Sequence, residues 1–318
     1  MSIYSSTASE QTPQEQEMSP GRWLFAMLVS ILLLAAINLL ISWRMDVFGY
    51  FRDPHGRELR TFDAHQRIVK YMLNKRYVPS NFDGLIVGAS ASVNWHPEAL
   101  TGYHFYNESL EGSNASEQRR LVEQALPKGH FRVALVVMYP HITASHSLND
   151  GLDNVSERET LGSINLFDTE LSTLQASRRH RPENSFANGS HVLINVPTPA
   201  PEQYLKKFDS VDEQDPQAVE DYRAVTQELM NTGTRVIYVT YPLWEPHYQV
   251  NKALVARYRA SIAQIMPAAP LIDFNGPEYT AFRSDPGNFL DNVHLSAVGG
   301  ERLSEMLNTR MHQALGDQ

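Results

Sequence analysis

Short apolar segments alternate with longer amphipathic segments along residues 84–315, and this alternation limits the fold of the chain more than any other feature. The apolar segments span residues 84–88, 104–107, 133–139, 235–241 and 271–274. Such short, mostly apolar runs are typical of strands that are buried on both faces of a parallel sheet. Neighbouring parallel strands need long crossover connections, which the amphipathic segments can supply as helices.

Several amphipathic segments carry recognisable helix ends. Asn114, Asp215 and Ser296 can each accept a backbone N–H as an N-cap, and Gly233 is a stop signal. The expected helices run from 115 to 129, from 216 to 233, from Lys252 to Met266, and from 297 towards the end of the chain. The pattern predicts an α/β fold: a flavodoxin-like three-layer sandwich around a five-stranded parallel sheet.

Composition excludes several classes of protein. The chain of 318 residues has no cysteine, which excludes disulfide frameworks, cysteine-ligated zinc, iron–sulfur clusters and thiol catalysis. Its net charge of -9 argues against a protein that coats nucleic acid or anionic lipid. We therefore expect no nucleic-acid partner.

Residues Trp23–Trp43 form an uncharged apolar run with a tryptophan at each end. At about 1.5 Å per residue these 21 residues would extend roughly 31 Å, close to the thickness of a bilayer hydrocarbon core. The run is longer than the apolar region of a typical signal peptide, and no small-residue cleavage site precedes Arg44. We expect an uncleaved, single-pass transmembrane anchor.

The remaining organisation follows from composition. Polar residues dominate the start of the chain, and apolar residues at helical spacing follow the anchor. A later irregular stretch contains four prolines, Pro182, Pro197, Pro199 and Pro201. The predicted parts are a disordered tail (1–20), the anchor (21–44), a helical linker ending at Pro79 (45–80) and the α/β domain (81–318) with an insertion at about 142–214.

The arginines on the two sides of the anchor are unequal. Arg22 precedes it, whereas Arg44, Arg52, Arg57 and Arg60 follow it. Taken alone, the positive-inside rule would place the large domain in the cytoplasm, although large domains cross membranes largely regardless of charge.

Residues suited to ester chemistry follow the predicted strands. Ser90 lies in a Gly-Ala-Ser-Ala-Ser turn after the first strand, and Gly112 lies in a loop after the second. Asp291 and His294 lie three residues apart after the fifth strand, just before the final helix. Because ligands bind beyond the carboxyl ends of parallel strands, we expect these residues to meet at one edge of the sheet.

Each of these residue types has a part in acyl transfer through a serine ester. A serine hydroxyl needs a base such as His294 to take its proton, and a carboxylate such as Asp291 orients the imidazole. Backbone N–H groups of Ser90 and Gly112 could stabilise the oxyanion. The sequence therefore predicts a Ser90–His294–Asp291 triad.

The order of these motifs resembles the SGNH (GDSL-type) hydrolase superfamily over residues 84–310, and the anchor is similar to that of its membrane-bound, extracytoplasmic O-acyltransferase branch. That branch includes proteins of lipoteichoic-acid D-alanylation and alginate O-acetylation. The resemblance implies Ser90 as nucleophile, Asp291 and His294 as its partners and Gly112 as an oxyanion donor. It further implies an inner-membrane protein whose domain faces the periplasm or cell exterior and needs no cofactor.

The resemblance also implies a reaction: transfer of an acyl group, which we expect to be acetyl, from a membrane-bound O-acyltransferase to an exported polysaccharide. Two departures from the pattern are Ala89, where the family has an acid, and Met138-Tyr139-Pro140-His141 in place of the G-x-N-D block. Alternatives are an esterase with the same triad and a catalytically silent adaptor for the acyltransferase.

Six further residues are candidates for substrate binding: Ser92, His96, Asn107, Tyr139, His141 and Trp244. Ser92 is also a rival nucleophile, but its place as the second serine suits support of the turn. His141 and His146 lack the spacing of a metal-binding helix, so we expect no metal site. Four N-x-S sequons, at Asn107, Asn114, Asn154 and Asn188, are interpreted as chance.

Overall fold

A computed structural model describes residues 19–52, 62–146, 152, 155, 163–178, 187–191 and 214–316. Nearly all of the predicted tail, the four prolines of the insertion and Asn154 lie outside these residues.

Five parallel strands form one sheet in the order β2-β1-β3-β4-β5, which confirms the predicted flavodoxin-like topology. The strands are β1 (Gly84–Val87), β2 (Phe105–Asn107), β3 (Val133–Met138), β4 (Arg235–Thr240) and β5 (Leu271–Asp273). β1 and β3 are buried along their whole length. Their alternate side chains enter two separate apolar clusters, one on each face of the sheet.

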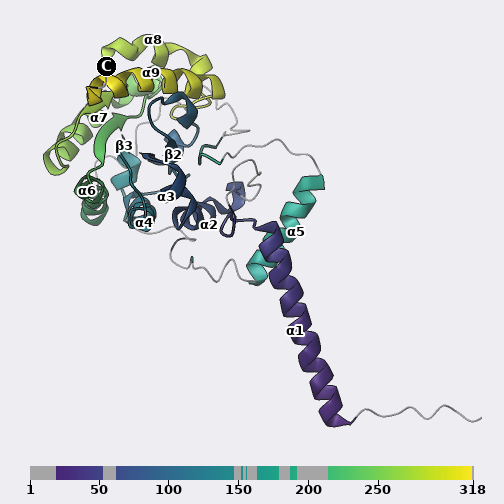
Figure 1. Ribbon diagram of the computed structural model, residues 1–318. Coiled ribbons are helices and arrows are strands. Elements are labelled where there is room, and N and C mark those ends of the chain that lie inside the picture. Colours follow the sequence, from purple (N-terminus) through teal and green to yellow (C-terminus); the bar gives the residue numbers. More distant parts are fainter. Residues whose placement is uncertain are drawn as a thin grey trace, which may run out of the picture.

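Helices cover both faces (Figure 1). One face is covered by α2 (Phe62–Asn74), α4 (Ala115–Ala125) and α6 (Pro216–Asn231). The other is covered by α9 (Ala297–Leu315), whose Leu303, Leu307 and Met311 are fully buried. α7 (Glu245–Ile265) has residues in both clusters.

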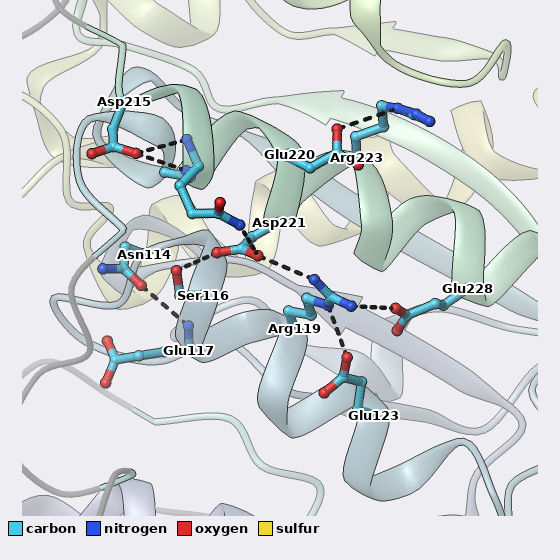
Figure 2. A network of polar contacts seen from close by, with 12 residues as sticks. Asn114, Ser116, Glu117, Arg119, Glu123, Asp215, Glu220, Asp221, Arg223 and Glu228 are labelled. Atoms are coloured by element: carbon cyan, nitrogen blue, oxygen red, sulfur yellow. Dashed lines mark hydrogen bonds and ion pairs between the residues drawn. The ribbon is translucent and has the colours of Figure 1, made fainter.

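The predicted N-caps are confirmed. The Asn114 side chain accepts the N–H of Glu117 at 3.1 Å, and Asp215 accepts two N–H groups at the start of α6 (Figure 2). Ser296 accepts the N–H of Gly299 at 3.0 Å. These bonds satisfy donors that a helix cannot satisfy internally, which is why the helices begin at these residues.

Other boundaries differ from the predictions. α7 begins at Glu245 rather than Lys252, because Pro246 in the first turn needs no backbone N–H partner. α4 ends at Ala125, before Gly129. The predicted linker contains two helices, α2 and α3 (Tyr77–Asn81), and Pro79 lies within the first turn of α3 instead of ending a helix. Two further helices, α5 (Ile164–Arg178) and α8 (Thr280–Ser284), were not predicted.

The apolar segment forms α1 (Pro20–Met45), which projects away from the sheet (Figure 1). Within the described residues it is the one helix long and apolar enough to cross a membrane. Its apolar side chains are exposed, Leu34 by 66% and Phe25 by 69%, so α1 is not a core helix of the domain. α5 contacts α1.

The backbone of the first turn of α9 packs directly against the backbone of two loops, at Asn288 and at Asn94. A Cβ at Gly299 would lie 2.0 Å from the carbonyl oxygen of Asn288, and a Cβ at Gly300 would lie 2.6 Å from that of Asn94. Both distances are far shorter than any van der Waals contact, so the two glycines permit the close approach of α9 to these loops.

We predict that Gly299→Ala destabilises the protein by about 1–3 kcal/mol, because overpacking at this contact outweighs the better helix propensity of alanine. Thermal unfolding of the full chain in detergent measures the effect. The exposed Glu301 in the same turn is the matched control, and Glu301→Ala should change stability by less than about 0.5 kcal/mol. Equal stability of the two variants would contradict the close contact.

Candidate active site

Ser90 lies where the chain turns sharply after β1. Gly88 and Ala89 continue the extended chain, Ala89 forms a single parallel bridge with Leu110, and Ser90 begins the 3₁₀ turn η1 (Ser90–Ser92). A Cβ at Gly88 would lie 2.2 Å from Ser92 Oγ. A glycine is therefore needed at Gly88 for the turn to fold back this tightly.

Asp291 and His294 are presented by a short closed loop. Phe289 and Leu295 form an antiparallel bridge, and Leu290 N–H donates to the carbonyl of His294 at 2.7 Å. Asp291 Oδ1 accepts the N–H groups of Val293 at 2.8 Å and His294 at 2.6 Å. These bonds orient the Asp291 carboxylate within its own loop.

The three predicted triad residues form one hydrogen-bonded chain. His294 Nε2 lies 3.0 Å from Ser90 Oγ, and His294 Nδ1 lies 2.7 Å from Asp291 Oδ2. Since an ionised carboxylate can only accept, Nδ1 carries the proton and Nε2 of the neutral ring is left to accept one from Ser90. The His294 side chain is 22% exposed, which leaves the site open to a substrate.

The pKa of Asp291 is below its ordinary value. Burial acts to raise this pKa, but the hydrogen bonds from the His294 side chain and from the backbone N–H groups of His294 and Val293 favour the charged form and outweigh burial. Asp291 therefore remains a carboxylate at neutral pH, as an orienting partner for imidazole must.

Contacts across the fold hold the serine turn against the histidine loop. Asn94 Nδ2 donates to the carbonyl of Leu295 at 2.7 Å, and the N–H of His96 donates to Ser304 Oγ at 2.9 Å. With Gly300 packed on the Asn94 carbonyl, these contacts set the distance between Ser90 and His294. The sequence analysis did not identify Asn94, Gly299 or Gly300 as residues that hold the site together. Two adjacent glycines inside a predicted helix were the one local sign of such a close contact.

Gly112 lies in the loop between β2 and α4, with φ at +63°. This left-handed conformation favours glycine. Apart from Gly112 and its two neighbours in the chain, no described residue has an atom within 4 Å of the position that a Cβ would occupy. The predicted role as an oxyanion donor remains a prediction.

Two of the candidate substrate-binding residues are fully buried, and we correct that prediction for both. Ser92 Oγ lies 2.7 Å from Ser109 Oγ and donates to the carbonyl of Ala89, so it supports the turn. Asn107 Nδ2 donates to the carbonyls of Ser92 and Val93. Side chains that face inward and have their hydrogen bonds satisfied there cannot contact a substrate from solvent.

Tyr139 and Trp244 lie near the triad. Burial, and then the negative charge of Asp291, raise the pKa of Tyr139, so its phenol stays protonated as a donor. The N–H of Trp244 donates to the carbonyl of Asn292 at 3.3 Å, inside the triad loop. These two residues remain candidates for substrate binding.

The histidine candidates lie in other surroundings. His141 is exposed, with its ring centroid 6.2 Å from that of Tyr139. His96 is bonded to Glu98, and this bond raises the pKa of His96. His146 Nδ1 lies 2.9 Å from Asp215 Oδ2. Within the part of the chain that the structure describes, no three acidic or histidine side chains are grouped to hold a metal ion.

We predict that Asp291→Asn lowers kcat for ester cleavage on the order of 10⁴-fold, because the amide favours the wrong tautomer of His294. Turnover of an aryl acetate by the full-length protein in detergent measures this. Asp285 is the matched control, because its carboxylate lies near the same loop and forms an ion pair with Arg302. Asp285→Asn should leave kcat within about threefold of the wild-type value.

We also predict how pH changes the effect of Asp291→Asn on the free energy of unfolding. Because the pKa of Asp291 is lowered on folding, its stabilisation is present above the pKa of the unfolded chain and is lost as pH falls through the folded-state value. The difference in unfolding free energy between wild type and Asp291→Asn should therefore shrink as the pH falls from the unfolded-state pKa of Asp291 through its folded-state pKa. A constant difference would contradict the lowered pKa.

No family model matches the sequence, and no curated protein matches it. The solved structures that are similar to it include a "putative platelet activating factor" from Streptococcus pneumonia, with 12% identity, a TM-score of 0.44, and coverage of 77% of this chain and 91% of the other. They also include a "putative acylhydrolase" from Bacteroides fragilis, with 12% identity, a TM-score of 0.39, and coverage of 73% and 87%. A third is a "GDSL-like lipase" from Bacteroides thetaiotaomicron, with 9% identity, a TM-score of 0.38, and coverage of 74% and 91%. At these identities and TM-scores, the likenesses assign neither a family nor a function to this chain.

Proposed function

We propose that this chain is a serine enzyme that carries an acyl group as an ester on Ser90 and passes it to a hydroxyl group. The hydrogen-bonded chain from Ser90 Oγ through His294 to Asp291 is the observation that supports this most strongly. A serine hydroxyl, an imidazole and a carboxylate in this order form the constellation that activates serine for acyl transfer on unrelated folds.

In the first half of the reaction, Ser90 Oγ attacks the carbonyl carbon of the acyl donor and its proton moves to His294 Nε2. The C–O or C–S bond to the donor then breaks, and the leaving group takes that proton from His294. Asp291 stays ionised and stabilises the imidazolium that exists between these two transfers. The backbone N–H groups of Ser90 and Gly112 would stabilise the oxyanion.

In the second half, an acceptor hydroxyl gives its proton to His294 Nε2 and attacks the Ser90 ester. The bond between the acyl carbon and Ser90 Oγ breaks, and the proton returns from His294 to Ser90. Water in place of the acceptor would make the enzyme an esterase. The triad serves both outcomes, so access of the acceptor to the acyl-enzyme decides between them.

We further propose that the acceptor is a hydroxyl of an exported polysaccharide and that the acyl group is acetyl. The apolar α1 is suited to anchor the domain at a membrane, and the motif resemblance over residues 84–310 favours the extracytoplasmic O-acyltransferase branch. Acetyl-CoA is cytoplasmic, so a domain on the far side of the membrane needs a donor. A membrane-bound O-acyltransferase is the partner that we propose for this step.

We predict that Ser90→Ala abolishes both aryl acetate turnover and covalent labelling by a serine-reactive fluorophosphonate, with kcat falling by on the order of 10³-fold or more. The exposed Ser261 on α7 is the matched control, and Ser261→Ala should keep both. Intact-protein mass spectrometry should find one acetyl group on the wild type and none on Ser90→Ala. Unchanged labelling of Ser90→Ala would rule out the serine ester.

The acceptor distinguishes transferase, esterase and adaptor. With an aryl acetate as donor, a transferase acetylates an added oligosaccharide faster than it releases free acetate, whereas an esterase does the reverse. In cells, a silent adaptor would sustain polysaccharide acetylation in Ser90→Ala and His294→Ala variants that accumulate normally. Loss of acetylation in both variants, with normal protein levels, excludes the adaptor.

The proposed orientation makes a separate prediction. A phosphatase reporter that folds only outside the cytoplasm, fused after Gln318, should be active. Four arginines follow the apolar segment and one precedes it, so the opposite topology is the specific alternative. Fluorescence of a green fluorescent protein fused at the same position, without phosphatase activity, would contradict an extracytoplasmic domain.

A further inference from the structure

One face of α2 carries buried polar side chains. Gln66, Lys70 and Asn74 recur at intervals of four residues, with Arg67 beside the first, so they share one side of the helix. Lys70 and Asn74 are fully buried and Gln66 is 7% exposed, whereas lysine, glutamine and asparagine are normally found at the surface. Such a buried polar face needs polar partners.

The partners lie at the end of β2, in the loop that follows it, in α4 and at Gly189. Lys70 Nζ donates to the carbonyl of Asn107 and, at 3.1 Å, to that of Gly189. Asn74 Nδ2 donates to Glu108 Oε1 at 2.8 Å and to the carbonyl of Leu121 at 3.1 Å. The start of this loop is therefore bonded to the later turns of α2.

The residue just before Gly112 is held by the first turns of α2. Gln66 Nε2 donates to Glu111 Oε1 at 2.9 Å, and Gln66 Oε1 accepts the N–H of Glu111 at 3.3 Å. Arg67 Nη2 donates to the carbonyl oxygen of Glu111 at 3.1 Å. Both sides of the Glu111 backbone are thus bonded to side chains of one helix.

Arg67 is itself held in place. Its Nε lies 2.6 Å from Glu117 Oε1, its Nη2 lies 3.2 Å from Glu117 Oε2, and Glu117 is fully buried. Two parallel bonds between guanidinium and carboxylate orient the planar group. Glu117 lies in the first turn of α4, which Asn114 caps (Figure 2).

The geometry of the peptide group links Arg67 to the predicted oxyanion donor. The carbonyl of Glu111 and the N–H of Gly112 belong to one planar trans peptide unit, in which C=O and N–H point in opposite directions. A bond that holds the carbonyl toward Arg67 therefore aims the N–H of Gly112 away from α2.

We propose that Arg67, assisted by Gln66, is a positioning residue that sets the direction of the Gly112 N–H for oxyanion stabilisation. This inference rests on the proposed serine-ester function. Arg67 does not touch the reacting atoms; it acts through the Glu111–Gly112 peptide. A donor misdirected by its peptide would weaken binding of the transition state and leave binding of the substrate unchanged.

The test uses three variants of the full-length protein with an aryl acetate. Arg67→Lys keeps a positive charge beside Glu117 and loses the forked guanidinium. Arg67→Met with Glu117→Gln removes the ion pair without leaving a buried carboxylate unpaired. Arg119→Met is the matched control, because Arg119 forms ion pairs with Asp221, Glu228 and Glu123 on another side of α4 (Figure 2).

We expect both Arg67 variants to lower kcat by on the order of 10-fold to 100-fold with KM changed by less than about twofold. The affinity for a boronic acid, which forms a tetrahedral anion on the catalytic serine, should fall by the same factor. Arg119→Met should lower the melting temperature and leave kcat and boronate affinity unchanged.

The outcomes separate the two proposals. If Ser90→Ala is inactive but both Arg67 variants keep kcat and boronate affinity within about threefold of wild type, the positioning role is overturned and the serine ester stands. If Arg119→Met lowers kcat as much as the Arg67 variants do, the effect is one of general stability, and the positioning role is again overturned. If Ser90→Ala retains activity, both proposals fail.

Discussion

The site depends on a hydrogen bond between two residues that are 204 positions apart in the chain, Ser90 and His294. Neither local segment can form it alone, since the serine turn follows the first strand of the sheet and the histidine loop follows the last. Their distance is set where α9 packs on both loops through Gly299 and Gly300 and where Asn94 bonds to the carbonyl of Leu295. A change in the packing of α9 on these two loops would separate His294 from Ser90.

The parallel sheet is the frame that makes this convergence possible. All five strands run in one direction, so the segments that follow them emerge at one edge. The serine turn and the loop of Gly112 come from neighbouring strands, and the bridge between Ala89 and Leu110 extends their pairing beyond the sheet. The two halves of the proposed oxyanion hole are thereby joined by backbone bonds.

The helix α2 joins the site to a part of the chain that lies before the sheet in the sequence. Its buried polar face is bonded to the loop that contains Gly112, and α2 is the next described helix after α1 in the chain. Buried polar networks restrict a segment to one arrangement, because every alternative leaves polar groups without partners. This part of the chain therefore contributes to the geometry of the site, although it precedes the first strand.

Much of the fold could be predicted from sequence, because the signals are local. Apolar strands, capping residues such as Asn114 and Ser296, and the glycine-rich turn before Ser90 each act within a few residues of their own position. The apolar residues of the unpredicted helix α5 have only weak helical periodicity. α7 starts earlier than predicted, with Pro246 in its first turn. The local pattern therefore missed one helix entirely and placed the start of another too late.

The sequence by itself determined the order of the chemical groups and the class of fold that brings them to one edge. Only the tertiary structure decided which polar residues face a substrate: Ser92 and Asn107 turn inward, and Arg67 and Gln66 are bonded to Glu111. The physical reason is that the direction of a side chain and the identity of its partner depend on residues far away in the chain, which periodicity and motif spacing do not encode.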